Sequence, residues 1–149
     1  MKRDNKQLTP HFSLYEMTAT LNADLQERNR DLSDEQVGKL LNMARFMEFI
    51  RLIIGRPLIV HSGYRCMELN GATPGSSTTS QHPLCEACDF NAEDLTPEQC
   101  YNLLCYEAPF LQFGQLIWEK RGDKEWVHIS VKGSRPPEKC GQIFKITTQ

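Results

Sequence analysis

The chain has 149 residues with 17 basic and 19 acidic side chains, which gives a formal net charge of −2 at pH 7. A chain of this length can bury a hydrophobic core that is stable without disulfide or metal cross-links. We expect one domain spanning residues 1–149. Because the charge is nearly balanced and the basic residues are scattered, a nucleic-acid partner is not expected.

Neither an export signal nor a membrane span is predicted. Met1-Lys2-Arg3 is basic, but a mostly polar run, 4–9, follows where a signal peptide needs an apolar one. The most apolar segment, 46–54, is interrupted by Glu48 and Arg51 and is too short to cross a bilayer. We therefore expect cytoplasmic synthesis and no membrane partner.

Capping boxes predict the starts of three helices, since a Ser or Thr followed three residues later by Glu or Gln satisfies the first backbone N–H groups. Such boxes occupy 13–16, 33–36 and 96–99. The second precedes a long run of apolar residues at helical spacing that stops at Gly55, and this helix is expected to be the main packing partner of a sheet. The third helix should end at Pro109, and the first has no clear end.

Five short apolar or alternating segments predict strands. They are 58–61, 87–91, 115–119, 126–131 and 143–146. The third and fourth flank a turn that contains glycine and are expected to form a β-hairpin, with the last strand at an edge. Helices first, then strands with one inserted helix, indicate an α+β fold with a small central, mainly antiparallel sheet and helices packed on one side.

The segment 80–90, which follows a loop of small and polar residues at 71–79, carries the most informative side chains. It places His82 and Asp89 seven residues apart, and imidazole and carboxylate are both ordinary zinc ligands. Two ligands do not make a site, so a third must come from elsewhere. His128 is the best candidate, and we expect the fold to bring the two segments together.

The predicted strand 126–131 determines where His128 points. Alternation places Trp126, His128 and Ser130 on one face and apolar residues on the other, which should pack against helices. A lone histidine in a strand is usually structural, but Glu125, three residues earlier, strengthens the case for a metal ligand. His128 is therefore expected on the open face of the sheet.

Other polar residues have plainer interpretations. His11 and His61 are not expected to be metal ligands. Glu119, at the end of a predicted strand, competes as an acid near the site but fits a solvated carboxylate. Glu93 and Asp94 precede a helix and suit its N-terminal dipole.

Six cysteines are many for a chain without a secretion signal, and we expect mostly reduced thiols. Cys85, Cys88, Cys100 and Cys105 have the order of a zinc site, but the last two are i and i+5 in a predicted helix and do not share a face. Buried small side chains are the favoured interpretation. A structural or redox protein that uses these cysteines is the alternative.

Four motifs, in this order, resemble the zinc D-Ala-D-Ala carboxypeptidase and dipeptidase family. They are Ser62-Gly63-Tyr64-Arg65, Ser80-Gln81-His82, Asp89 and Glu125-Trp126-Val127-His128, and the resemblance covers 12–130. That family includes phage murein endopeptidases and belongs to a wider group with lysostaphin-type peptidases and the hedgehog signalling domain. The resemblance implies the fold of that group.

The resemblance also implies roles for individual residues. His82, Asp89 and His128 would hold one zinc ion and leave a fourth position for water. Glu125 would be the general base of the reaction. Arg65 would stabilise negative charge on the tetrahedral intermediate or on the substrate.

Ser80 and Trp126 would contact the substrate, a stem or cross-bridge peptide of peptidoglycan. The implied reaction is hydrolysis of an amide bond by a monomeric carboxypeptidase or murein endopeptidase. Because murein lies outside the cytoplasm, the missing signal suggests a phage enzyme, either an endolysin that depends on a holin or an enzyme carried in the virion. The alternative is a non-catalytic module that binds zinc or the cell wall on the same scaffold.

Two positions depart from the family pattern. Cys85 stands where the family usually has glycine, three residues after His82, and a positive φ there would cost on the order of 1 kcal/mol for a cysteine. A thiol beside the metal could also compete as a ligand. Glu125, in a regular strand, points to the face opposite His128, so its role requires a bulge or a turn.

Overall fold

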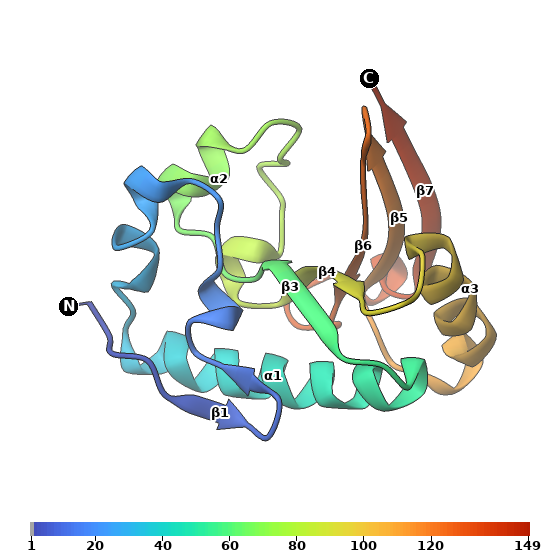
Figure 1. The fold of residues 1–149 in the computed structure, drawn as a ribbon, viewed down its shortest axis with the longest axis horizontal. Coiled ribbons are helices and arrows are strands. Elements are labelled where there is room, and N and C mark those ends of the chain that lie inside the picture. The colour runs from blue at the N-terminus through green and yellow to red at the C-terminus, as the bar shows by residue number, and fades with distance from the viewer. Residues whose placement is uncertain (1) are drawn as a thin grey trace.

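The computed structural model describes residues 2–149, whose centre is a five-stranded sheet (Figure 1). Its strands are β3 (Leu58–Ser62), β4 (Ala87–Ala92), β5 (Gln115–Arg121), β6 (Lys124–Ser130) and β7 (Gln142–Thr148). Their order is β3-β4-β6-β5-β7, and three of the four pairings are antiparallel while β7 runs parallel to β5. The expected α+β fold with a mainly antiparallel sheet is confirmed.

Two helices begin where the sequence predicts, and the first of them also ends there, whereas the second ends two residues before the expected Pro109. In α1 (Asp34–Ile54) the Ser33 side chain accepts from the Gln36 backbone, and Gly55 ends the helix in the left-handed conformation with φ 73°. The α3 helix (Pro97–Glu107) starts with the same reciprocal box. These caps satisfy backbone N–H groups that the first helical turn leaves without partners.

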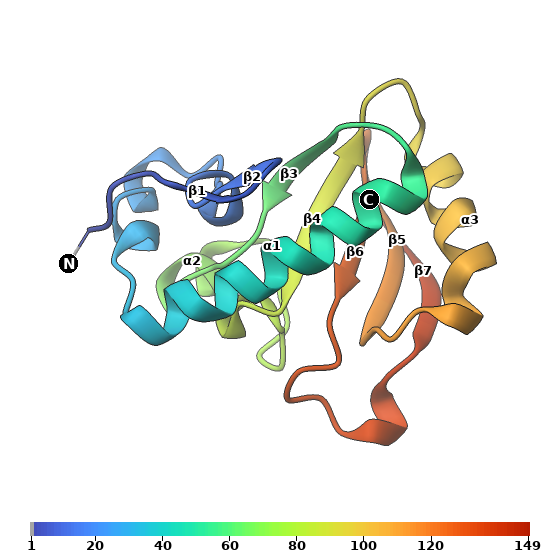
Figure 2. The same cartoon turned by 90° about the horizontal axis from the view of Figure 1, so that it is seen from below.

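The helices α1 and α3 cover one face of the sheet, and α1 runs across its strands (Figure 2). The shared core includes Met47, Ile50, Leu104, Phe90, Val127 and Ile129. Each large apolar side chain buried there contributes about 1.5–3 kcal/mol. Because this face takes the helices, the alternate residues of β4 and β6, which include Asp89 and His128, lie on the other face.

The predicted first helix is wrong. Ser13 and Glu16 do exchange the two hydrogen bonds of a capping box, each 3.1 Å long. They open only a 3-10 turn, Glu16–Thr18, because the Met17 carbonyl accepts from the Tyr64 backbone instead of from a following turn. The helix therefore stops after one turn.

The rest of the N-terminal region is a short hairpin followed by isolated 3-10 turns. The elements are β1 (Gln7–Thr9), β2 (Phe12–Ser13), η2 (Ala23–Leu25) and η3 (Arg28–Arg30). Together with α2 (Met67–Ala72), a short helix that the sequence did not predict, they lie beyond β3 at the end of the sheet remote from β7 (Figure 1). Within residues 2–149 no helix has the length and apolar character to cross a membrane.

Candidate metal centre

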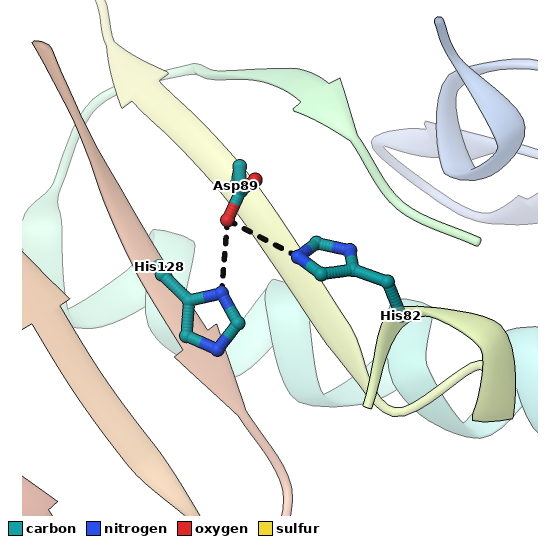
Figure 3. Close-up of side chains that lie close together, drawn as sticks. All are labelled: His82, Asp89 and His128. Atoms are coloured by element: carbon teal, nitrogen blue, oxygen red, sulfur yellow. Dashed lines mark hydrogen bonds and ion pairs between the residues drawn. The ribbon is translucent and has the colours of Figure 1, made fainter. Parts of the chain in front are cut away.

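His82, Asp89 and His128 converge on the open face of the sheet (Figure 3). Asp89 of β4 and His128 of β6 are direct cross-strand partners, and the 3-10 turn His82–Leu84 brings His82 to them. His128 Nδ1 lies 2.9 Å and His82 Nε2 lies 3.3 Å from the same oxygen, Asp89 Oδ1. Each of the three residues is less than a tenth exposed.

The tautomer of His82 shows that this arrangement fits a cation. His82 Nδ1 lies 2.7 Å from the Gly63 carbonyl oxygen, which can only accept, so Nδ1 carries the hydrogen. In the neutral ring Nε2 then presents a lone pair to the Asp89 carboxylate, and this nitrogen has no hydrogen-bond partner. Two acceptors that face each other at 3.3 Å need a positive charge between them. The backbone hydrogen bond of Nδ1 is the usual support of a metal-ligating histidine.

The charge states of the group suit the same role. Burial lowers the pKa of His82 and so favours the neutral ring, although the Asp89 charge opposes this shift. Burial disfavours the ionised form of Asp89, but its interactions with the adjacent imidazoles of His82 and His128 outweigh this effect and hold the pKa of Asp89 well below its usual range. Two imidazoles and one carboxylate form an ordinary donor set for zinc.

Arg65 lies against this group. Its Nη2 is 3.8 Å from Asp89 Oδ2, and its backbone N–H donates to the His82 carbonyl. Glycine at position 63 lets the backbone of this turn lie close to the Met17 carbonyl, since a Cβ there would clash with that carbonyl. Burial lowers the pKa of Arg65 while the Asp89 charge opposes the shift, and the guanidinium remains protonated. Its buried Nε has no hydrogen-bond partner.

Asn29 holds the Arg65 turn in place, a role that no sequence motif indicated. Its fully buried amide donates to the carbonyls of Thr18 (2.9 Å) and Tyr64 (2.8 Å) and accepts from the Cys66 backbone (2.8 Å). It thus uses both amide hydrogens and its oxygen to join the N-terminal region to the residues on either side of Arg65. A single asparagine within a polar run carries no periodic signal that would reveal this.

A second set of contacts joins the His82 turn to the chain after His128. Gln81 Nε2 donates to the Val131 carbonyl at 2.8 Å. The buried Glu86 carboxylate accepts from the backbone and the hydroxyl of Ser134, at 3.0 and 2.9 Å. These bonds fix the position of His82 relative to β6, and sequence reasoning missed both Gln81 and Glu86.

The structure does not bring Glu125 to the metal-ligand group. The pairing of β5 with β6 is continuous, without the bulge that would turn this side chain round. Glu125 instead points to the helix-covered face, where its Oε1 accepts from the Trp118 indole at 2.6 Å. Side chains therefore alternate along β6 as the sequence predicts. The general-base role that the family resemblance implies for Glu125 has no support from the position of its side chain.

Glu119 lies on the site face of the same hairpin. It is the direct partner of Trp126 across β5 and β6, and the Trp126 indole donates to its carboxylate. The expectation of a solvated carboxylate is wrong, because Glu119 is only partly exposed. Burial, together with the nearby charge of Asp89, raises the pKa of Glu119.

The remaining sequence candidates are placed as follows. The Ser80 hydroxyl accepts from the His82 backbone at 3.1 Å and so supports the His82 turn. Trp126 is half-buried on the site face. His11 and His61 are exposed and lie outside the group, and His11 pairs with Glu48.

Cys85 adopts the left-handed conformation, with φ 61° and ψ 30°, which the family glycine would adopt without strain. Burial raises the pKa of its thiol to about 12, so it is protonated at neutral pH and a poor competitor for metal. Cys85, Cys88 and Cys100 belong to the hydrophobic core, and all six cysteines are free. Within residues 2–149, the group of His82, Asp89 and His128 is the only one with three or more potential ligands.

Two imidazoles and a carboxylate on the open face of an α+β sheet form the donor set of a metal-dependent hydrolase. Comparison with protein families agrees, because the family described as Peptidase M15 matches residues 10–130. The chain belongs to this family of metallopeptidases, which confirms the resemblance noted in the sequence. None of the curated proteins matches the chain. The match ends with β6, so β7 lies outside it.

Proposed function

We propose that this chain is a zinc metallopeptidase that hydrolyses a peptide bond in bacterial peptidoglycan. The observation that carries the proposal is the buried convergence of His82, Asp89 and His128, in which the His82 lone pair faces the Asp89 carboxylate. Membership of the Peptidase M15 family supports peptide hydrolysis as the reaction. The motifs shared with murein peptidases support the wall peptide as substrate.

The ligands would be His82, Asp89 and His128, each of which offers one ligand atom within 4.8 Å of the other two. Zinc held by three protein ligands polarises a carbonyl and lowers the pKa of water. Arg65 would stabilise the negative charge that develops on the scissile carbonyl oxygen, since its guanidinium is charged, buried and only partly paired. Ser80 and Trp126 would border the substrate.

The same proposal extends to substrate and setting. A stem or cross-bridge peptide is the substrate class, cleaved either as a carboxypeptidase or as a murein endopeptidase. A monomeric phage lysis enzyme, released by a holin or carried in a virion, is the setting that the sequence motifs favour. A non-catalytic zinc-binding or wall-binding module is the competing function.

Metal analysis and peptide hydrolysis test the proposal together. Wild type, His82→Ala and the control His61→Ala, which alters an exposed histidine of β3, would be purified without added metal. We expect about one zinc per chain in wild type and control and almost none in His82→Ala. Only the zinc-containing proteins should release fragments from purified peptidoglycan, as detected by mass spectrometry.

Three results would count against the function. Zinc retained in His82→Ala would indicate that the cysteines hold the metal. Bound zinc without any released fragment would favour the non-catalytic binding module. Absence of metal from wild type would contradict the site itself.

A further inference from the structure

The β5–β6 hairpin carries two carboxylates, each hydrogen-bonded to an indole, and they lie on opposite faces. Glu119 pairs with Trp126 on the face that holds His128, whereas Glu125 pairs with Trp118 on the face covered by helices. Both pairs come from the same two strands, so only the alternation of side chains separates them. The face decides which carboxylate can serve the metal centre.

Glu119 is close enough to act there. Its cross-strand partner is Trp126, and His128 lies two residues further along β6 on the same face. Such diagonal neighbours have their backbones about 7–8 Å apart, a gap that long side chains bridge. The Glu119 carboxylate is near enough to Asp89, His128 and Arg65 for their charges to act on it.

In the part of the chain that the structure describes, the carboxylate of Glu119 accepts a hydrogen bond on one oxygen only. Trp126 Nε1 donates to Oε2. Among residues 2–149 no other hydrogen bond or ion pair to Glu119 is found, so Oε1 keeps its capacity to accept a proton. Glu125, in contrast, points to the opposite face and cannot reach the centre without breaking the hairpin pairing.

We propose that Glu119, in place of Glu125, is the general base of the hydrolysis, an inference that rests on the proposed function. A water molecule attacks the scissile carbonyl carbon, and the new C–O bond forms as the proton leaves the water for Glu119 Oε1. When the C–N bond breaks, Glu119 returns this proton to the leaving nitrogen. The carboxylate is then regenerated, and no net charge or electron is gained or lost.

Trp126 is the positioning residue for this base. Its indole donates to one carboxylate oxygen, Oε2, and so restrains the orientation of the carboxylate that carries Oε1. Trp126→Phe keeps an aromatic ring but removes the donor, so we expect a loss of roughly tenfold in kcat with little change in KM. Loss of substrate binding alone would raise KM instead.

The test compares Glu119→Gln with its matched rival Glu125→Gln. Both changes keep the shape of the side chain, and the glutamine oxygen can still accept from the indole, so both proteins should fold. We expect Glu119→Gln to retain about one zinc while kcat falls by about 10²–10⁴-fold. Glu125→Gln should stay within about threefold of wild type. Equal losses in the two variants, or a Glu119→Gln enzyme above about a tenth of wild-type kcat, would overturn the assignment.

A binding measurement separates this inference from the proposed function. Acetohydroxamate chelates zinc, and its hydroxyl hydrogen can be donated to a neighbouring carboxylate. Titration of zinc-loaded proteins should show about tenfold weaker binding to Glu119→Gln than to wild type, and no change for Glu125→Gln. If wild type cleaves no peptidoglycan, the proposed function fails. The hydroxamate affinities still test the placement of Glu119 beside the metal centre. Equal affinities of wild type and Glu119→Gln would overturn that placement, and unequal ones would support it.

Discussion

The two faces of the β5–β6 hairpin differ more in their surroundings than in their residues. Each face carries one tryptophan and one glutamate joined by a hydrogen bond. On one face, Trp118 and Glu125 lie beside α3, where Tyr101 packs on the Trp118 ring and Lys145 lies over it. On the other face, Glu119 lies near Asp89, His128 and Arg65. The same chemical pair thus stabilises the fold on one face and serves the site on the other.

The difference between faces can be tested most strongly at two adjacent residues of β6. Ile129 is fully buried under the helices, and Ile129→Ala should lower the free energy of unfolding by about 2–5 kcal/mol through the cavity it leaves. His128→Ala should abolish zinc binding and hydrolysis while the apo protein keeps most of its stability. Urea unfolding of zinc-free proteins checks both expectations. A His128→Ala protein as unstable as Ile129→Ala would show that the open face is also a structural core.

Asn29 gives the next largest expected effect, because it links the N-terminal region to the site. Asn29→Ala leaves two buried carbonyls and the Cys66 N–H without partners and should cost about 1–3 kcal/mol. Since Arg65 lies between two of the restrained residues, kcat should also fall. Asn42→Ala on the exposed side of α1 is the matched control and should change stability by less than about 0.5 kcal/mol. Unaltered kcat in a well-folded Asn29→Ala protein would separate Arg65 from this support.

The two tryptophans sharpen the comparison further. Trp118→Phe and Trp126→Phe each remove one indole hydrogen bond, so both should lower stability by about 1 kcal/mol. Only Trp126→Phe should reduce kcat, because only its carboxylate partner lies on the site face. Steady-state kinetics and thermal unfolding of the two variants provide the measurements. If both variants lost kcat equally, hairpin stability rather than the position of Glu119 would limit activity.

Much of the fold and the site could be predicted because those parts depend on interactions between residues close in the sequence. The caps of α1 and α3, the five strands and the facing of His128 follow from local hydrogen bonding and from side-chain alternation. The first helix failed because a long-range bond from Tyr64 took the Met17 carbonyl, which no local pattern encodes. Motif spacing found the three residues of the candidate metal centre but not Glu119.

Glu119 was missed for a physical reason. Glu125 has the motif spacing to His128, but proximity across a hairpin depends on register, and the register places Glu119 beside Trp126. Its position at a predicted strand end suggested solvation, yet β5 continues to Arg121 and Glu119 is only partly exposed. A sequence pattern records spacing along one strand, whereas this site is assembled across three.

Cys85 is expected to give the smallest effect, and its sign is informative. Cys85→Gly should relieve about 1 kcal/mol of left-handed backbone strain while losing about 1 kcal/mol from the buried side chain, so stability should hardly change. Cys85→Ala keeps the strain and loses part of the burial, so it should be the less stable of the two. Denaturant unfolding can rank the three proteins. An alanine variant more stable than the glycine variant would show that the turn after His82 stores no strain, and that the family glycine serves another purpose.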